Sequence, residues 1–253
     1  VANIELSPTA NDHFALQTDI KILPGVTISR ITSTPMEARR SACHLSDGND
    51  DMVFQLNIGR NYLLMTAGHT NQAYTCQTGE GCFVTRTVPS SIRSKIDNDG
   101  LLNIAFSRAT LGTLISAKSD VVTAALPADQ TLGLFARCAL DAFATPETNA
   151  QERAAELHDL AAGVLGADGQ PAKDRLFKRT LPKLRLRAIK ADIDVYISRP
   201  DLSLDWIARR HCISGSYVRS LFDQESTAFT DYLFTLRLSR VPRILSTPIY
   251  SDR

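Results

Sequence analysis

The sequence lacks the features that mark membrane-spanning proteins, disulfide-rich scaffolds and structural zinc proteins. No apolar run approaches the ~18 residues that a transmembrane helix needs, and the first residues show no signal-peptide pattern. The five cysteines are odd in number and have no paired spacing, which argues against a disulfide framework and a zinc site. We therefore expect a cytoplasmic protein in which each cysteine is a small buried apolar residue.

Catalytic motifs are also missing. The strand-rich first part of the chain offers His44 and His69, with His13 near its start, and no His-x-His pair occurs anywhere. Metal-dependent barrel enzymes usually cluster histidines with a carboxylate on neighbouring strands. The sequence contains no Gly-x-Ser-x-Gly elbow, phosphate loop or dinucleotide fingerprint. It therefore predicts neither an enzyme nor a metal or cofactor site.

Charge is distributed unevenly although the net charge of the whole chain is only +1. Residues 173–253 contain 16 Lys and Arg against 9 Asp and Glu, whereas residues 1–172 contain 12 against 18. This asymmetry is expected when only one domain meets phosphate groups. A basic domain can also face anionic lipid or another protein, so charge alone leaves these alternatives open.

The first part of the chain predicts a small β-barrel followed by helices. Residues 52–58 alternate, which places Met52, Phe54 and Leu56 on one face of a strand. Glycine-containing turns separate further short runs at 62–66, 72–77, 82–85 and 92–106, with one turn at 97–100. Apolar residues at helical spacing then predict an antiparallel helix pair over 131–144 and 151–165. The expected fold class is α+β, with a β-barrel or jelly roll and a helix pair.

A linker and an all-helical region follow. Residues 166–171 contain two glycines and a proline without an apolar pattern, so we place the boundary there. The expected domains are residues 1–166 for ligand sensing and dimerisation, a linker at 167–174, and a helical domain at 175–253. Leu186, Ile189, Ile193 and Ile197 predict an amphipathic helix at the start of this domain.

Two short helices joined by a tight turn then predict a helix-turn-helix unit. Ser203 and Ser214 are positioned as their N-caps, and residues 211–213 form the turn. The second helix would enter a DNA major groove, where Arg219 can donate two hydrogen bonds to guanine. The predicted DNA-binding residues are Gly215, Ser216, Arg219, Ser220, Thr227 and Arg237. A three-helix bundle without DNA binding gives the same pattern and stays open.

A hydrophobic staple is also predicted at the start of the last helix. Phe229 precedes Thr230, the expected N-cap, and Phe234 is its expected partner. The helix that begins there carries Arg237, Arg240 and Arg243, which we expect near the sugar-phosphate backbone.

A resemblance to a known family is carried by Asp201-Leu202-Ser203-Leu204, Ile207-Ala208, Ile213-Ser214, Tyr217-Val218, Leu221-Phe222, Thr227-Ala228-Phe229, Tyr232-Leu233 and Arg237-Leu238. These residues resemble the first helix-turn-helix of AraC-type (AraC/XylS) regulators. Residues 28–35 and 79–81 resemble landmarks of the cupin-like sensor of that family. The resemblance implies a second helix-turn-helix unit, which this sequence does not contain before Arg253. Pro242 is predicted to kink or end the helix that would link the two units.

The resemblance implies a ligand-responsive transcriptional regulator, an activator of a catabolic or related operon in a bacterium. Its partners would be promoter DNA, RNA polymerase, a second copy in a homodimer, and a small organic effector such as an aromatic acid or another acid. We expect the effector inside the barrel. The predicted ligand-binding residues are Arg40, His44, Phe54, Leu56, Tyr62, Leu64, Phe83 and Thr85. The alternative is a small-molecule-binding or dimerisation module that acts through protein partners.

Overall fold

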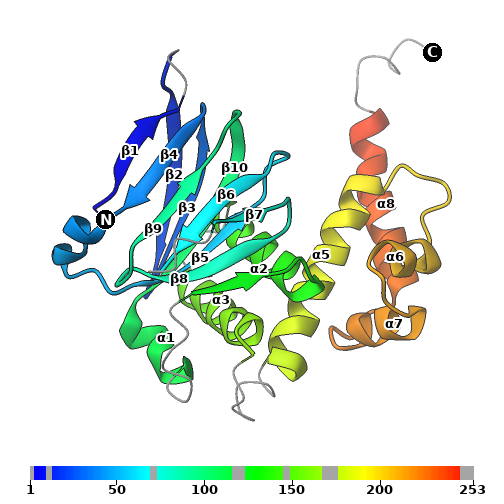
Figure 1. Cartoon of the computed structure of the whole chain (residues 1–253). Helices are drawn as coiled ribbons and strands as arrows, with labels where there is room; N and C mark the ends of the chain where they lie inside the picture. The colour runs from blue at the N-terminus through cyan, green and yellow to red at the C-terminus, as the bar shows by residue number, and fades with distance from the viewer. Residues whose placement is uncertain are drawn as a thin grey trace. The chain divides into compact units, whose positions relative to one another are not determined.

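The computed structural model describes residues 3–9, 13–68, 73–115, 123–144, 149–166 and 176–245. The chain divides into two compact units, unit 1 over Val1–Leu176 and unit 2 over Phe177–Arg253. Figure 1 shows strands and helices in unit 1 and helices alone in unit 2. The linker predicted at 167–174 lies outside the described residues.

Unit 1 is built on two antiparallel sheets. Sheet A has the order β1-β4-β9-β6-β7 and sheet B the order β11-β8-β5-β10-β3-β2. The strands of sheet A are β1 (Glu5–Pro8), β4 (Met36–Arg40), β9 (Ser90–Arg93), β6 (Leu63–Ala67) and β7 (Ala73–Cys76). Those of sheet B are β11 (Thr123–Leu126), β8 (Gly81–Thr85), β5 (Met52–Asn57), β10 (Asn98–Phe106), β3 (Val26–Ser33) and β2 (Leu16–Leu23).

The two sheets face each other across an apolar core. Met65 and Ile92 of sheet A share one buried cluster with Cys82 and Leu101 of sheet B. We call the faces that meet there the inner faces of the sheets and the opposite ones the outer faces. This arrangement confirms the predicted α+β fold with a barrel-like pair of sheets.

Helices α2 (Gln130–Asp141) and α3 (Ala150–Val164) cover the outer face of sheet B (Figure 1). The ring of Phe54 on β5 lies 4.9 Å from that of Phe135 on α2, centroid to centroid. The ring of Phe106 on β10 lies 6.4 Å from that of His158 on α3. The centre of sheet B is thus covered on both faces, and every residue of β5 is buried. The predicted helix pair is confirmed.

Several elements of unit 1 were not predicted from the sequence. They are strands β1, β2 and β11, helix α1 (Arg108–Ile115) and the 3-10 helix η1 (Ala42–Asp47). The helix predicted over 131–144 ends in the 3-10 helix η2 (Ala142–Ala144). The turn predicted at 97–100 is instead the start of β10, where the register with β3 shifts between Asn98 and Leu101. A two-residue turn at Pro24-Gly25 joins β2 to β3, and Gly25 has the positive φ of 71° that glycine tolerates best.

A π-helical turn at Leu176–Thr180 spans the boundary between the units. Unit 2 then contains helices α5 (Leu181–Tyr196), α6 (Leu204–Arg210), α7 (Gly215–Asp223) and α8 (Phe229–Leu245). One core joins the four helices, because Ile189 and Ile193 of α5, Ile207 of α6 and Leu221 of α7 are fully buried together with Leu233 of α8. The predicted amphipathic helix and helix-turn-helix unit are therefore confirmed. No helix among the described residues is long and apolar enough to cross a membrane.

Two expectations for α8 differ from the structure. The backbone remains helical past Pro242 to Leu245, so proline does not end the helix, and a kink there stays a prediction. The staple between Phe229 and Phe234 does not form, since Phe234 is 64% exposed. Phe229 instead packs on Phe222 of α7 with ring centroids 5.5 Å apart.

Candidate functional site

The helix-turn-helix unit is fixed by two serine caps and a strained turn. Ser203 Oγ accepts a hydrogen bond from Trp206 N at 3.3 Å and begins α6. Ser214 Oγ accepts one from Tyr217 N at 3.2 Å and begins α7. Between the helices, Cys212 has a φ of 52°, a left-handed conformation that is costly for a residue with a Cβ. The two caps fix the residues at which α6 and α7 begin, and so determine how α7 crosses α6.

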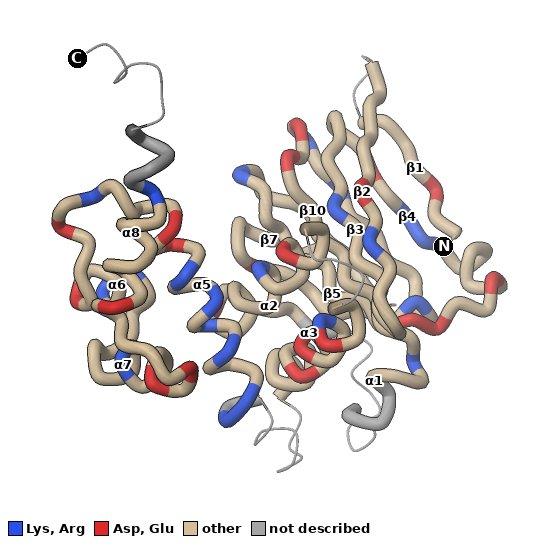
Figure 2. The backbone as a smooth tube through the Cα atoms, turned by 180° about the vertical axis from the view of Figure 1, so that it is seen from behind, with Lys and Arg blue, Asp and Glu red and all other residues tan. Residues whose placement is uncertain are grey.

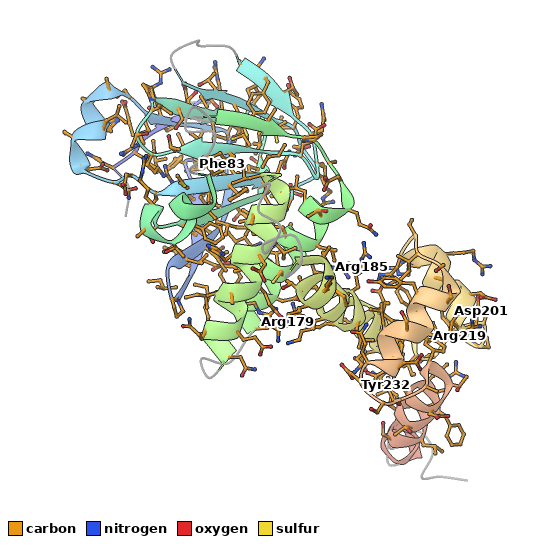
Figure 3. All side chains as sticks on the ribbon, turned by 90° about the horizontal axis from the view of Figure 1, so that it is seen from below. Phe83, Arg179, Arg185, Asp201, Arg219 and Tyr232 are labelled. Carbon is orange, nitrogen blue, oxygen red and sulfur yellow. The ribbon has the colours of Figure 1, made fainter. Side chains whose placement is uncertain are left out.

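The exposed face of α7 carries three of the predicted DNA-binding residues. Ser216, Arg219 and Ser220 are exposed, whereas Val218 on the opposite face is fully buried. Figure 3 labels Arg219 on this helix. Within the described residues the Arg219 guanidinium has no hydrogen-bond or ion-pair partner, so its donors are available to a ligand. Ser220 Oγ donates to Tyr217 O at 2.9 Å and can still accept.

Gly215 and Arg237 have contacts that differ from the predicted ones. A Cβ on Gly215 would lie 2.8 Å from Leu204 Cδ2, so this glycine allows the close approach of α7 to α6 rather than facing outward. Arg237 Nη2 donates to Arg199 O at 2.8 Å, beyond the end of α5. Arg240 forms an ion pair with Asp194. Arg237 and Arg240 therefore both join α8 to the C-terminal end of α5. Thr227 is half-buried just before α8.

Sequence reasoning missed a set of stacked arginine–aromatic contacts in unit 2. Arg210 Cζ lies 4.6 Å from the ring centroid of Tyr196 and 5.5 Å from that of Trp206. Arg185 Cζ of α5 lies 5.4 Å from the ring centroid of Tyr217 on α7. The hydrogen bond to Asp192 raises the pKa of Arg210 above its usual value. Figure 2 shows Lys and Arg positions along α5 and α6. No spacing rule would have found the contacts between these arginines and the aromatic rings.

Unit 1 contains a polar groove on the outer face of sheet A. Its volume is about 460 Å³, and it is lined by Glu37, Arg39, Arg40, Ser41, Ala42, Leu64, Thr66, Gly68, Ala73, Pro89, Ser90, Ser91 and Arg93. Cross-strand pairing aligns Arg39 with Ser91 and Ser91 with Thr66, while Glu37 and Leu64 flank Arg93 on either side. The side chains between them, such as Met65 and Ile92, point to the buried inner face.

The groove offers an arginine, two hydroxyls and one ion pair. Arg39 Nη2 lies 2.7 Å from Glu37 Oε1, and this carboxylate raises the pKa of Arg39. Thr66 Oγ1 and Ser91 Oγ are 2.8 Å apart. Within the described residues the exposed Arg93 guanidinium has no hydrogen bond or ion pair. The groove therefore presents donors to a small anion or hydroxylated molecule.

The expected barrel-interior position is wrong for four predicted ligand-binding residues. Leu64 lies on the outer face of sheet A. Phe54, Leu56 and Phe83 lie on the outer face of sheet B, where Phe54 contacts Phe83 at 5.1 Å and Phe135 of α2 at 4.9 Å. Alternation was read correctly, but the sequence did not show which face turns to the helices. Thr85 shares that face and its hydroxyl lies 2.9 Å from that of Thr87.

The remaining predicted ligand-binding residues lie on or near sheet A. Leu64 lines the groove, and Tyr62 is 38% exposed just before β6. Arg40 also lines the groove, but its guanidinium is bound to Asp47 at 2.7 Å and to the carbonyl oxygens of Asn3 and Arg86. The Arg40 hydrogen bonds hold the pKa of Asp47 well below its usual range. His44 Nδ1 accepts a hydrogen bond from Ser41 N at 3.0 Å.

A polar row crosses the inner face of sheet B. Cross-strand pairing aligns Ser29, Asn103, Gln55 and Cys82 on β3, β10, β5 and β8. Cys82 Sγ lies 3.4 Å from Gln55 Oε1, and burial raises the pKa of Cys82 to about 11. Asn103 Oδ1 has no hydrogen-bond partner within the described residues. This row places polar groups inside the core between the two sheets.

The described residues contain no group of three or more His, Cys, Asp and Glu side chains that could hold a metal ion. His69 lies outside the described residues. None of the five cysteines forms a disulfide. Cys76, Cys82 and Cys138 are buried as expected, but Cys43 and Cys212 are exposed.

No family model matches the sequence, and no curated protein matches it. Among solved structures, the chain is similar to the AraC-like transcriptional activator CuxR, with a TM-score of 0.54, 16% identity, and coverage of 94% of this chain and 86% of that one. ToxT from Vibrio cholerae matches with a TM-score of 0.32 and 11% identity over 89% of this chain and 98% of its own. The oxalate decarboxylase OxdC from Bacillus subtilis matches with 0.27 and 11% over 45% and 34%.

The first of these likenesses shows the fold. It covers most of the chain, so the order of a two-sheet α+β part and a helical part is shared with an AraC-like activator. The other two have lower TM-scores and add nothing to this conclusion. Function has to be argued from the residues of α7 and of the groove.

Proposed function

We propose that the protein is a ligand-responsive, DNA-binding transcriptional regulator. The observation that carries this proposal is the helix-turn-helix unit whose second helix, α7, presents Arg219 with uncommitted donors between two exposed serines. A helix with this geometry fits the major groove, and arginine is the side chain that most often reads guanine there.

The charge of unit 2 favours nucleic acid over an apolar partner. The C-terminal residues 173–253 carry 16 basic against 9 acidic side chains. Positive charge near the reading helix releases counterions from DNA and gives affinity that falls as salt rises. Arg237 and Arg240 are engaged with α5, so phosphate contacts from α8 are not part of the proposal. Ser216, Arg219, Ser220 and the half-buried Thr227 remain its DNA-facing residues.

We propose that the effector is a small organic acid bound in the groove of sheet A. The groove volume of about 460 Å³ suits a small molecule, and Arg93 supplies a cation beside the hydroxyls of Thr66 and Ser91. A carboxylate on Arg93 with a hydroxyl on Thr66 or Ser91 would satisfy both kinds of donor. Leu64, which lies opposite Arg93 in the sheet, provides an apolar contact for the rest of the molecule.

In this proposal the protein binds promoters of a catabolic or related operon in the cytoplasm and catalyses no reaction. It functions as an activator through RNA polymerase, and as a homodimer in which unit 1 binds effector. Effector and DNA then change each other's affinity by the same factor, because binding at two linked sites is reciprocal.

The experiment is selection of genomic DNA fragments by the purified protein, followed by fluorescence-anisotropy titration of the enriched site. We expect a few promoter regions to be enriched and their affinity to fall steeply with salt. Arg219→Ala should lower affinity for the best site by about 1–3 kcal/mol and relax its preference at one base pair. Arg209→Ala is the matched control, since Arg209 is an exposed arginine of α6 outside the reading face and its loss should leave base preference unchanged.

Two outcomes oppose the proposal. If no fragment is enriched, with or without candidate acids, sequence-specific DNA binding is excluded and a protein-binding module takes its place. If fragments are enriched but Arg219→Ala keeps the full base preference, the protein binds DNA and another element reads it.

A further inference from the structure

Strand β2 is an exposed edge of sheet B. It stands last in the strand order, and among the residues that the structure describes it pairs only with β3. Seven of its eight residues are exposed or half-buried, and only Leu23 is buried. A long edge strand leaves a row of backbone N–H and C=O groups without partners, which is a template for another strand.

Large apolar side chains are also exposed on this strand. Ile20 is 57% exposed, Ile22 is 75% exposed and Leu16 is 37% exposed. All three lie on the same face of β2, because their cross-strand partners on β3 are Ser29, Thr27 and Ser33. Apolar exposure of this kind along a hydrogen-bonding edge is usual where a protein surface is covered by a partner.

We propose that β2 pairs antiparallel with β2 of a second copy of this chain, so that the two B sheets join into one. A two-fold axis at Ile20 sets the register. Each Asp19 then lies opposite the partner's Lys21, and each Lys21 lies opposite the partner's Asp19. The dimer is isologous, as most two-subunit assemblies are.

Charge selects this register over its neighbours. If the axis moves to Lys21, the two copies of Lys21 face each other, and if it moves to Asp19, the two copies of Asp19 do so. Like charges directly opposite destabilise a strand pair, whereas opposite charges stabilise it. A register in which one strand slips by a single residue would pair side chains that point to opposite faces of the sheet, so the pleat excludes it.

The same register covers the apolar face. Ile20 packs on the partner's Ile20, and Ile22 lies opposite the partner's Thr18. Because Ile22 is 75% exposed in the single chain, this contact removes apolar surface from water without repacking the core. An interface of one strand pair is small, so we expect a dissociation constant in the micromolar range.

This inference rests on the proposed homodimer and adds the surface on which its two copies meet. The test is sedimentation velocity of the full chain over a concentration series, with Asp19→Lys, Lys21→Asp and the double exchange. We expect Asp19→Lys to weaken the dimer about tenfold or more, and the double exchange to restore most of that affinity with inverted pairs. Lys21 also has an interaction within its own chain, so Asp19→Lys is the informative single variant.

A second pair of variants tests the apolar face. Ile22→Asp should weaken the dimer, whereas Ile96→Asp is the matched control, because Ile96 is an isoleucine that is 46% exposed outside β2. A dimer unaffected by both Asp19→Lys and Ile22→Asp would overturn the β2 surface and leave the homodimer standing. A wild-type chain that stays monomeric at high concentration overturns the surface and the homodimer together, while the DNA-selection experiment still decides DNA binding.

Discussion

Replacing Cys212 with glycine should stabilise unit 2. Cys212 has a φ of 52° in the turn between α6 and α7. A left-handed backbone costs a residue with a Cβ about 1–2 kcal/mol, and glycine loses about 0.5–1 kcal/mol more conformational freedom on folding, so the net gain is about 0.5–1 kcal/mol. Cys212 is exposed, so removing its thiol leaves no cavity.

The assay uses a probe already present in unit 2. Trp206 is the only tryptophan of the chain, and its ring lies 5.1 Å from that of Tyr196 in the folded unit. Its fluorescence during urea unfolding therefore reports unit 2 and not unit 1. With a urea slope of about 1–3 kcal/mol per M, the Cys212→Gly midpoint should rise by about 0.2–1 M.

The control variant is Cys212→Ala, which removes the thiol and keeps the Cβ. Its midpoint should stay close to that of the wild type, because the left-handed strain remains. A Cys212→Gly midpoint equal to or below that of Cys212→Ala would refute the strain at this turn. It would also show that the turn is held in place without a backbone cost.

Two further predictions concern the stability of unit 1, which can be measured by circular dichroism of its sheets during urea unfolding. Gly81→Ala should destabilise unit 1 by about 1–3 kcal/mol through overpacking, because the new Cβ would lie 2.6 Å from Gln55 O. The control is Gly133→Ala on α2, whose new Cβ meets nothing within 4 Å and should stabilise unit 1. Equal effects of the two substitutions would contradict the packing argument. Because the pKa of Asp47 is lowered in the folded state, its carboxylate stabilises the fold above the unfolded pKa of about 3.9. This stabilisation is lost as the pH falls below that value. Asp47→Asn should therefore lower stability at neutral pH and flatten its decline below about pH 4, and a decline as steep as that of the wild type would remove the Arg40–Asp47 pair from the explanation.

The helical unit was the part best predicted from the sequence, because its signals are local. Ser203 and Ser214 lie where caps are needed, and Val218, Leu221 and Phe222 repeat at helical spacing and are fully buried. What failed there depends on tertiary contacts. Nothing in the sequence near Arg237 shows that its guanidinium reaches the carbonyl oxygens at the end of α5.

The barrel was predicted as a class but its site was not. Alternation in β5 correctly separates Phe54 from Gln55, yet it cannot say which face meets the other sheet and which meets α2. That choice is made by strand order and by helices 80 residues later in the chain. The groove could have been suspected from the polar alternation at 90–93, where Ser91 and Arg93 share a face, but its partners on β4 and β6 come together only through pairing across the sheet.

The bonds that Arg237 and Arg240 make with the end of α5 have a mechanical consequence. They join α5 to α8, the first and last helices of unit 2. Because α7 shares one buried core with both helices, it can tilt against α5 only if buried contacts break. If the proposed regulator is a dimer, we expect effector binding to displace α5, α7 and α8 together. The effector should then change how two copies of α7 are spaced along DNA and leave unchanged the bases that each copy reads.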